Sequence, residues 1–187
     1  KNSFIVMIFI LPMWMNFMLR TLAWRLILLN NGILNQILTT LGFGKVHLMN
    51  TIWAVILGTV YDYLPFMVLP IYNALVKIDN DVISAAQDLG AGQWTILRRI
   101  IIPLSIPGVV SGITMVMVPS ISEFVIASML GGGKVYLIGN VIEQAFNSGY
   151  ADIHAGSGLS LSLMVLILIS MVIYRFFDGE EGESSLW

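Results

Sequence analysis

Cysteine is absent from this 187-residue chain, and charged residues are scarce. Without cysteine the chain can form neither disulfides nor thiolate sites. Charged residues make up 11% of the chain, whereas a soluble domain carries about a quarter. His47 and His154 stand far apart, with no carboxylate at metal-ligand spacing, so no metal site is predicted. The net charge is −2 and the basic residues are scattered, which excludes a nucleic-acid-binding patch.

Catalytic motifs are missing as well. No G-x-S-x-G nucleophile elbow occurs. The run "GGGK" at residues 131–134 does not fit a phosphate loop, because Ser128 and Val135 stand where that motif needs Gly and Ser or Thr. No nucleophile, base and oxyanion donors converge along the chain. We therefore predict no catalytic residue, no cofactor and no enzyme activity.

Long apolar runs dominate what is present. Hydrophobic residues make up 57% of the chain, and the mean hydropathy is +0.87. A membrane-spanning helix needs about 20 mostly apolar residues. On that criterion we predict four spans, over residues 2–19, 48–76, 104–130 and 156–177. The sequence thus indicates an all-α, polytopic membrane protein in a lipid bilayer, with an acidic, irregular tail at 178–187.

Two connecting segments have helical periodicity of their own. Residues 20–47 predict short amphipathic helices, broken at Asn30–Gly32 and at Gly42–Gly44. In the connection after residue 130, apolar residues recur at helical spacing, which predicts a helix in the membrane interface. These are Leu137, Ile138, Val141, Ile142, Ala145 and Phe146.

The connection over residues 79–103 differs from the apolar runs on both sides of it. Asp79 or Asp81 suits a helix N-cap, and Gly90 suits the left-handed residue that ends a helix. A second short helix is expected to end at Pro103. Small residues such as Ala86 would let another protein surface approach closely. The segment is therefore either a docking helix or an ordinary solvated loop.

The same connection resembles the coupling loop of ABC importer permeases, which is written EAA, three residues, Gly, nine residues, I-x-L-P. The matching residues are Ala85, Ala86, Gly90, Ile100 and Pro103. Ser84 replaces the family's Glu, which removes its charge, and Ile102 replaces Leu. Further stretches are similar to spermidine/putrescine-type permeases: "LPMWMNFMLR", "NGILNQIL", "YLPFMVLPIYNAL", "RRIIIPLSIPGVVSG" and "LGGGKVYLIGNVI".

This resemblance implies a MetI-like ABC permease fold over residues 1–177, in a bacterial cell membrane. It implies two ATPase subunits, a second permease subunit and an extracytoplasmic polyamine-binding protein as partners. The ATPase-coupling residues would be Ser84, Ala85, Ala86, Gln87, Asp88, Leu89, Gly90 and Ala91. Such permeases have six spans, so we expect the chain to be a fragment that begins just before the third.

A path for a polycationic cargo needs to be lined by carboxylates and aromatic rings. Asp62 and Glu123 are the acidic residues inside the predicted spans, and intramembrane acids usually face a cavity. Tyr61 and Tyr63 flank Asp62, and Trp14 is a further candidate. Each has an alternative role, because the acids can reach the lipid headgroups and a tryptophan can anchor the interface.

Orientation and cargo follow from charge. We compare the basic residues on the two sides of the membrane. The side of the 79–103 connection has Lys1, Lys77, Arg98, Arg99 and Arg175, and the other side has Arg20, Arg25, Lys45 and Lys134. This majority of one favours a cytoplasmic connection. Iron, sulfate or phosphonate is the alternative cargo, although an anion would favour basic residues in the spans.

Gly108 and Gly112 form a G-x-x-x-G pair that predicts close helix packing.

Overall fold

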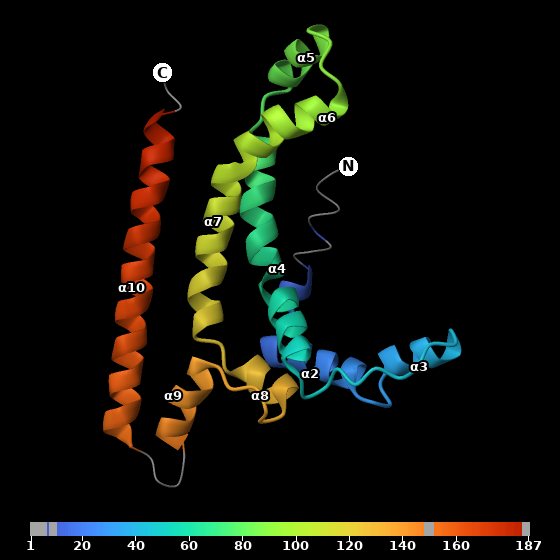
Figure 1. Ribbon diagram of the computed structural model, residues 1–187, viewed down its shortest axis with the longest axis vertical. Coiled ribbons are helices and arrows are strands. Elements are labelled where there is room, and N and C mark those ends of the chain that lie inside the picture. Colours follow the sequence, from blue (N-terminus) through green and yellow to red (C-terminus); the bar gives the residue numbers. More distant parts are fainter. Residues whose placement is uncertain (1–6, 8–10, 148–151, 185–187) are drawn as a thin grey trace. The chain divides into compact units, whose positions relative to one another are not determined.

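A computed structural model describes residue 7 and residues 11–147 and 152–184, with side chains up to residue 172. Every regular element within these ranges is a helix, which confirms the all-α prediction (Figure 1). In chain order they are η1 (Leu11–Trp14), α2 (Phe17–Leu28), α3 (Ile33–Thr40), α4 (Ile52–Val76), α5 (Asn80–Asp88), α6 (Gln93–Ile96), η2 (Leu97–Ile101), α7 (Ile102–Ile121), α8 (Val125–Gly131), α9 (Ile138–Asn147) and α10 (Ile153–Ser184).

The chain divides into two compact units, and the long helices α4 and α7 contribute to both. Unit 1 contains residues 1–14 and 63–117, and unit 2 contains residues 15–62 and 118–187. Within the described residues, three helices are long and apolar enough to cross a membrane. They are Ile52–Val76, Gln93–Ile121 and Ile153–Val172.

Part of the expected first span over residues 2–19, namely residues 2–6 and 8–10, lies outside the described residues. Its described part is not one continuous helix. The 3₁₀ turn η1 ends at Trp14, and Asn16 then caps α2, because its side-chain oxygen accepts a 2.9 Å hydrogen bond from the Met18 amide. Asparagine is a preferred N-cap residue, so a new helix begins here.

The second short helix predicted within residues 79–103 does not end at Pro103, contrary to the sequence prediction. It runs from Gln93 to Ile121 and contains the π-helical turn η2 at Leu97–Ile101. There the Ile102 amide donates to the Leu97 carbonyl, five residues back. Proline clashes with the carbonyl four residues before it in a regular helix. A wider turn accommodates Pro103, as single π-turns do elsewhere.

Two other boundaries differ from expectation. The span predicted to reach residue 130 ends at Ile121, and a turn at residues 122–124 separates it from α8. The cause is the buried Glu123, which caps the next helix instead of continuing the first. The tail expected to be irregular from residue 178 is helical up to Ser184. The tail contains no proline, and its glutamates are good helix formers that offset the poor helix propensity of Gly179 and Gly182.

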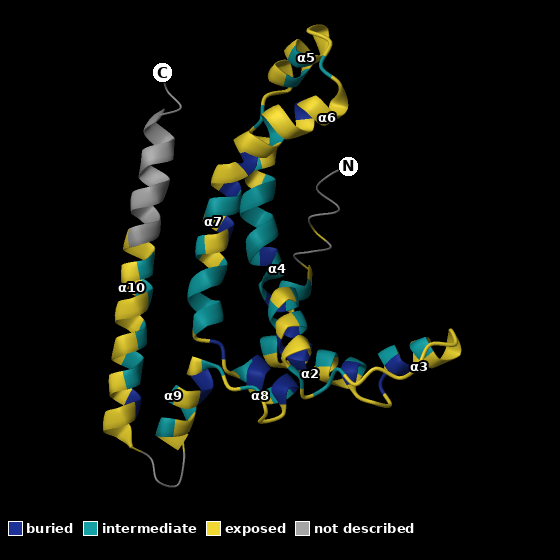
Figure 2. Ribbon diagram, viewed as in Figure 1, coloured by how far each residue is buried: buried dark blue, intermediate teal, exposed yellow. Residues whose placement is uncertain are grey.

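The core of unit 2 joins α2, the first half of α4 and α8. Its fully buried members are Leu28, Ala54, Val55, Ile126, Ala127 and Leu130. Gly58 allows this contact, because an added Cβ would lie 2.5 Å from a methyl carbon of Leu130. Figure 2 shows α8 as the most continuously buried helix of this unit.

In unit 1 the predicted glycine pair packs closely. An added Cβ on Gly108 would lie 2.7 Å from the Pro70 carbonyl oxygen, and one on Gly112 would lie 2.7 Å from the Met67 sulfur. Both neighbours belong to α4. The prediction of close packing is confirmed, and the partner helix lies within this chain.

Candidate functional site

Helix α5 has well-formed signals at both ends, as its sequence predicts. At the start, the Asp79 carboxylate accepts a 3.0 Å hydrogen bond from the Asp81 amide. At the end, Gly90 is left-handed, with φ +80. The Gly90 amide donates to the Gln87 carbonyl and the Ala91 amide to the Ala86 carbonyl. This pair of bonds is a Schellman motif, so the turn after α5 has a defined shape.

The segment is exposed along its length. No residue of α5 is buried, and Figure 2 shows most of α5 and of α6 in the exposed class. Leu89 is 89% exposed and Trp94 is 73% exposed. An added Cβ on Gly90 or Gly92 would meet no atom within 4 Å. A helix of fixed shape therefore presents large apolar side chains and small residues together, which is what a docking surface requires.

Asp62 of α4 lies in unit 2 and is 1% exposed. One carboxylate oxygen, Oδ1, is 2.9 Å from Nε of Arg20 on α2. The other oxygen, Oδ2, accepts a 3.3 Å hydrogen bond from the Thr21 hydroxyl. Both carboxylate oxygens thus contact α2. Sequence reasoning missed the pairing of Arg20 with Asp62, although an arginine at the end of an apolar run is a signal for a buried partner.

Glu123, the other predicted acid, is also buried, at 6% exposed. Its Oε1 accepts a 2.9 Å hydrogen bond from the Ile126 amide in the first turn of α8. A carboxylate is favourable there because the helix N-terminus carries partial positive charge. Arg20, Asp62 and Glu123 are all buried residues of unit 2. We call Arg20, Asp62 and Glu123 the charge cluster.

Asn140 holds α9 against α8 beside Glu123, and sequence reasoning missed it. Its side-chain nitrogen donates to the Phe124 carbonyl at 2.9 Å and to the Ser128 hydroxyl at 2.8 Å. Its side-chain oxygen accepts from the Leu137 amide. An asparagine in an amphipathic helix carries no signal for such contacts, because they depend on which helix packs alongside.

The predicted aromatic residues are divided between the two units. Tyr61 lies in unit 2, where its ring meets Trp24 edge-on with centroids 5.2 Å apart. Tyr63 and Trp14 belong to unit 1. Tyr63 contacts Phe66, with ring centroids 6.3 Å apart, and Trp14 is 87% exposed. Of the predicted set, Tyr61, Asp62 and Glu123 therefore belong to unit 2.

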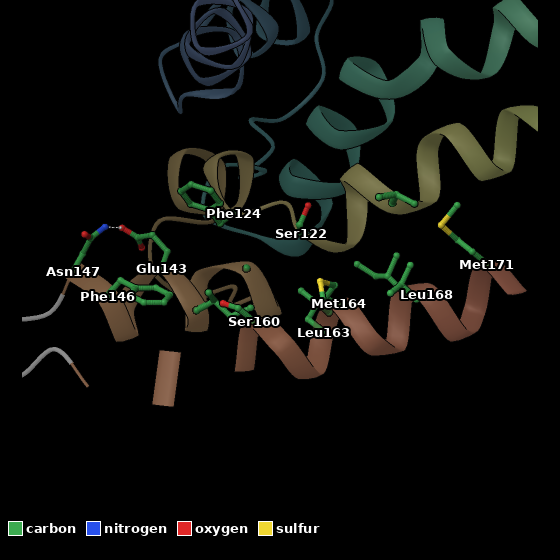
Figure 3. Close-up of a pocket in the computed structure, with 14 residues that line it drawn as sticks. Ser122, Phe124, Glu143, Phe146, Asn147, Ser160, Leu163, Met164, Leu168 and Met171 are labelled. Carbon is green, nitrogen blue, oxygen red and sulfur yellow. Dashed lines mark hydrogen bonds between the residues drawn. The ribbon is translucent and has the colours of Figure 1, made fainter. Parts of the chain in front are cut away.

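Unit 2 also contains an apolar cavity of about 670 Å³, lined by α9, α10 and the residues around the end of α7 (Figure 3). Phe124, Phe146 and Met164 are among its lining side chains, and Glu143 is the charged one. The Glu143 carboxylate accepts a 2.9 Å hydrogen bond from Asn147. The cavity offers mainly hydrocarbon contacts.

The chain is similar to known transport permeases. The chain is 40% identical to the spermidine/putrescine transport system permease protein PotB of Haemophilus influenzae, over 88% of this chain and 58% of the relative. It is 37% identical to PotB of Escherichia coli, over 91% of this chain and 62% of the relative. The chain thus spans about three fifths of the length of these curated relatives.

Among solved structures, the chain is similar in fold to a bacterial alginate ABC transporter. That transporter is in complex with a periplasmic protein that carries an alginate pentasaccharide. The TM-score is 0.65 at 17% sequence identity, over 93% of this chain and 62% of the matched chain. A family model described as "binding-protein-dependent transport system inner membrane component" matches residues 2–180. The resemblance seen in the sequence is confirmed: the chain belongs to this family of inner-membrane transport components and is a multi-pass membrane protein.

Proposed function

We propose that this chain is a transmembrane permease subunit of an ATP-driven importer of polyamines such as spermidine and putrescine. Support comes from the similarity to PotB proteins over most of the chain. It also comes from the transport family to which the chain belongs. In this role the permease forms the path through the membrane, and ATP is hydrolysed by other subunits.

One observation carries the coupling part of the proposal, namely the exposed α5 between two helices that can span a membrane. We propose that residues 84–91 dock on an ATPase subunit at the cytoplasmic face. The Schellman turn at Gly90 fixes the direction in which Leu89 projects. The alanines allow close approach, and the exposed Leu89 would supply apolar area at the contact.

The partners proposed for the whole transporter follow from the same family reasoning. They are two ATPase subunits, a second permease subunit that completes the path, and an extracytoplasmic protein that delivers polyamine. For the path itself we propose Asp62 and Glu123 as acidic residues. Tyr61, Tyr63 and Trp14 would add aromatic faces, which attract ammonium groups.

The coupling proposal is tested by co-purification of the permease with its ATPase. Gly90→Arg is expected to abolish the association, because the side chain projects from the docking turn. Gly42→Arg is the matched control, since Gly42 has φ +83 and open space around its Cβ position, as Gly90 does. It lies between α3 and α4 and should leave association unchanged. ATPase binding that survives Gly90→Arg would contradict the docking role.

The cargo proposal is tested by uptake into vesicles that contain the assembled transporter. Labelled spermidine should enter in an ATP-dependent manner, and excess sulfate or phosphonate should not compete. Ferric iron tests the remaining alternative. If an anion or iron enters and spermidine does not, the cargo is wrong while the coupling result still stands.

A further inference from the structure

The helix from Gln93 to Ile121 is longer than the hydrocarbon core of a bilayer is thick. It contains 29 residues, which at about 1.5 Å per residue give a length of about 44 Å. The hydrocarbon core is about 30 Å thick, and an average tilt of about 20° shortens the helix by only about 3 Å in projection. Part of this helix therefore extends into the headgroup layer.

The distribution of charge identifies the end that extends. Residues 100–121 carry no charged side chain, and at about 1.5 Å per residue they are about 33 Å long, which matches the hydrocarbon core. The turn before them contains Arg98 and Arg99, which are both exposed. Residues 93–99 therefore lie at the level of the headgroups, with the two arginines next to the hydrocarbon.

One face of this end carries the side chains that bind headgroups. Ile96 is 4% exposed, so the face on which it lies is packed within the protein. Trp94 and Arg98 precede and follow Ile96 by two residues, which places each of them about 160° around the helix from it. Both side chains are exposed. Tryptophan is enriched at membrane interfaces, and the planar guanidinium of arginine matches the geometry of a phosphate.

A groove in unit 1 adds a third positive charge and apolar walls. It has a volume of about 710 Å³ and is lined by α4, α7 and a residue of η1. Lys77 lines it together with Leu104, which follows Arg98 by less than two helical turns. Phe66 and Met115 belong to its apolar lining. A groove with a positive charge and hydrocarbon walls suits a phospholipid, which has a charged headgroup and apolar chains.

Positive and negative charges occupy different parts of the connection. Asp81 and Asp88 belong to α5 and Asp79 caps it, whereas the two arginines lie in η2, where the membrane helix begins. Among the residues that the structure describes, neither Arg98 nor Arg99 forms an ion pair. Both arginines are thus available to an anion in the headgroup layer.

We propose that Arg98, Arg99 and Lys77 bind the headgroup of an anionic phospholipid, with Trp94 beside it and the acyl chains along the groove. The bound lipid holds the end of the connection at the membrane surface and leaves α5 free to contact another protein. A zwitterionic lipid binds more weakly, because it has no net negative charge. The inference requires only that the chain spans a membrane, so it does not depend on the proposed polyamine cargo.

Native mass spectrometry of the complete transporter in a neutral detergent, titrated with dioctanoyl phosphatidylglycerol, tests the site. Arg98→Gln with Arg99→Gln should weaken binding by about thirtyfold, because each basic residue near an anionic surface contributes about fivefold. Lys77→Gln should weaken it by about fivefold for the same reason. Dioctanoyl phosphatidylcholine should bind the wild type more weakly, and inorganic phosphate should not displace the lipid, because phosphate has no acyl chains.

Arg25→Gln with Lys45→Gln is the matched control, because it removes two exposed positive charges from unit 2. It should change the affinity for phosphatidylglycerol by less than about twofold. Arg98→Lys with Arg99→Lys keeps both charges and should bind nearly as tightly as the wild type.

An unchanged affinity for phosphatidylglycerol in the glutamine pair at residues 98 and 99 overturns the site. So does an equal loss in the control pair, which would show a general effect of charge. If the glutamine pair loses an ATPase subunit and keeps the lipid, the arginines serve a protein contact instead. Should that pair fail to assemble, Lys77→Gln decides, since an unchanged affinity there also overturns the site.

Discussion

The helix α5 and the charge cluster place their chemically active residues in opposite environments. In α5 the large apolar side chain of Leu89 is 89% exposed, although apolar side chains usually avoid water. In the charge cluster the carboxylate of Asp62 is 1% exposed, although carboxylates usually seek water. The exposed leucine points to a protein surface that covers α5, whereas the buried carboxylate already has a cationic partner in Arg20 of α2. Departures from normal burial thus mark the proposed sites of this permease.

The largest expected effect comes from the same substitution in the two environments. Leu130→Ala in the core of unit 2 should lower the free energy of unfolding by about 2–5 kcal/mol, because it leaves a cavity. Leu89→Ala should change it by less than about 0.5 kcal/mol. Thermal denaturation of the purified permease in detergent measures both.

For the affinity of the permease for the ATPase, Leu89→Ala should have a larger effect than Leu130→Ala. Leu89→Ala is expected to weaken association by about tenfold to a hundredfold, since a buried leucine contributes about 1.5–3 kcal/mol. Equal losses of stability from the two substitutions would show that α5 is packed within the permease, and the comparison would then be wrong.

An intermediate effect is expected where α7 packs against α4 in unit 1. Gly108→Leu forces a side chain against the Pro70 carbonyl of α4, which should destabilise the fold by about 1–3 kcal/mol. Gly158→Leu is the control, since Gly158 lies within α10 and an added Cβ there meets nothing within 4 Å. Thermal denaturation should show a loss for the first variant alone.

The smallest expected effect is at the end of α5. Gly90→Ala places a side chain at φ +80, and the left-handed conformation costs an L-residue about 1–2 kcal/mol. Gly92→Ala, where φ is negative, should cost less. Hydrogen exchange of the α5 amides should rise for Gly90→Ala only. Equal exchange in both variants would mean that the Schellman turn does not hold the helix end.

The sequence predicted the ends of α5 but not the ion pair, and the difference is physical. Asp79 and Gly90 act on amides and carbonyls within a few residues, so their effect is readable locally. Arg20 and Thr21 reach Asp62 from another helix, and Thr21 and Asp62 are 41 positions apart. Such a contact depends on packing. Pro103 was misread because a π-turn lets the helix continue through it.

Coupling to ATP hydrolysis requires that α5 is the surface that an ATPase subunit contacts. The chain has no cysteine, so single cysteines can be introduced without a background. With Leu89→Cys, a short bifunctional reagent should cross-link the permease to the ATPase in native membranes. Leu41→Cys, also at an exposed leucine, should give no such product. Cross-linking from Leu41 and none from Leu89 would contradict the proposed role of α5.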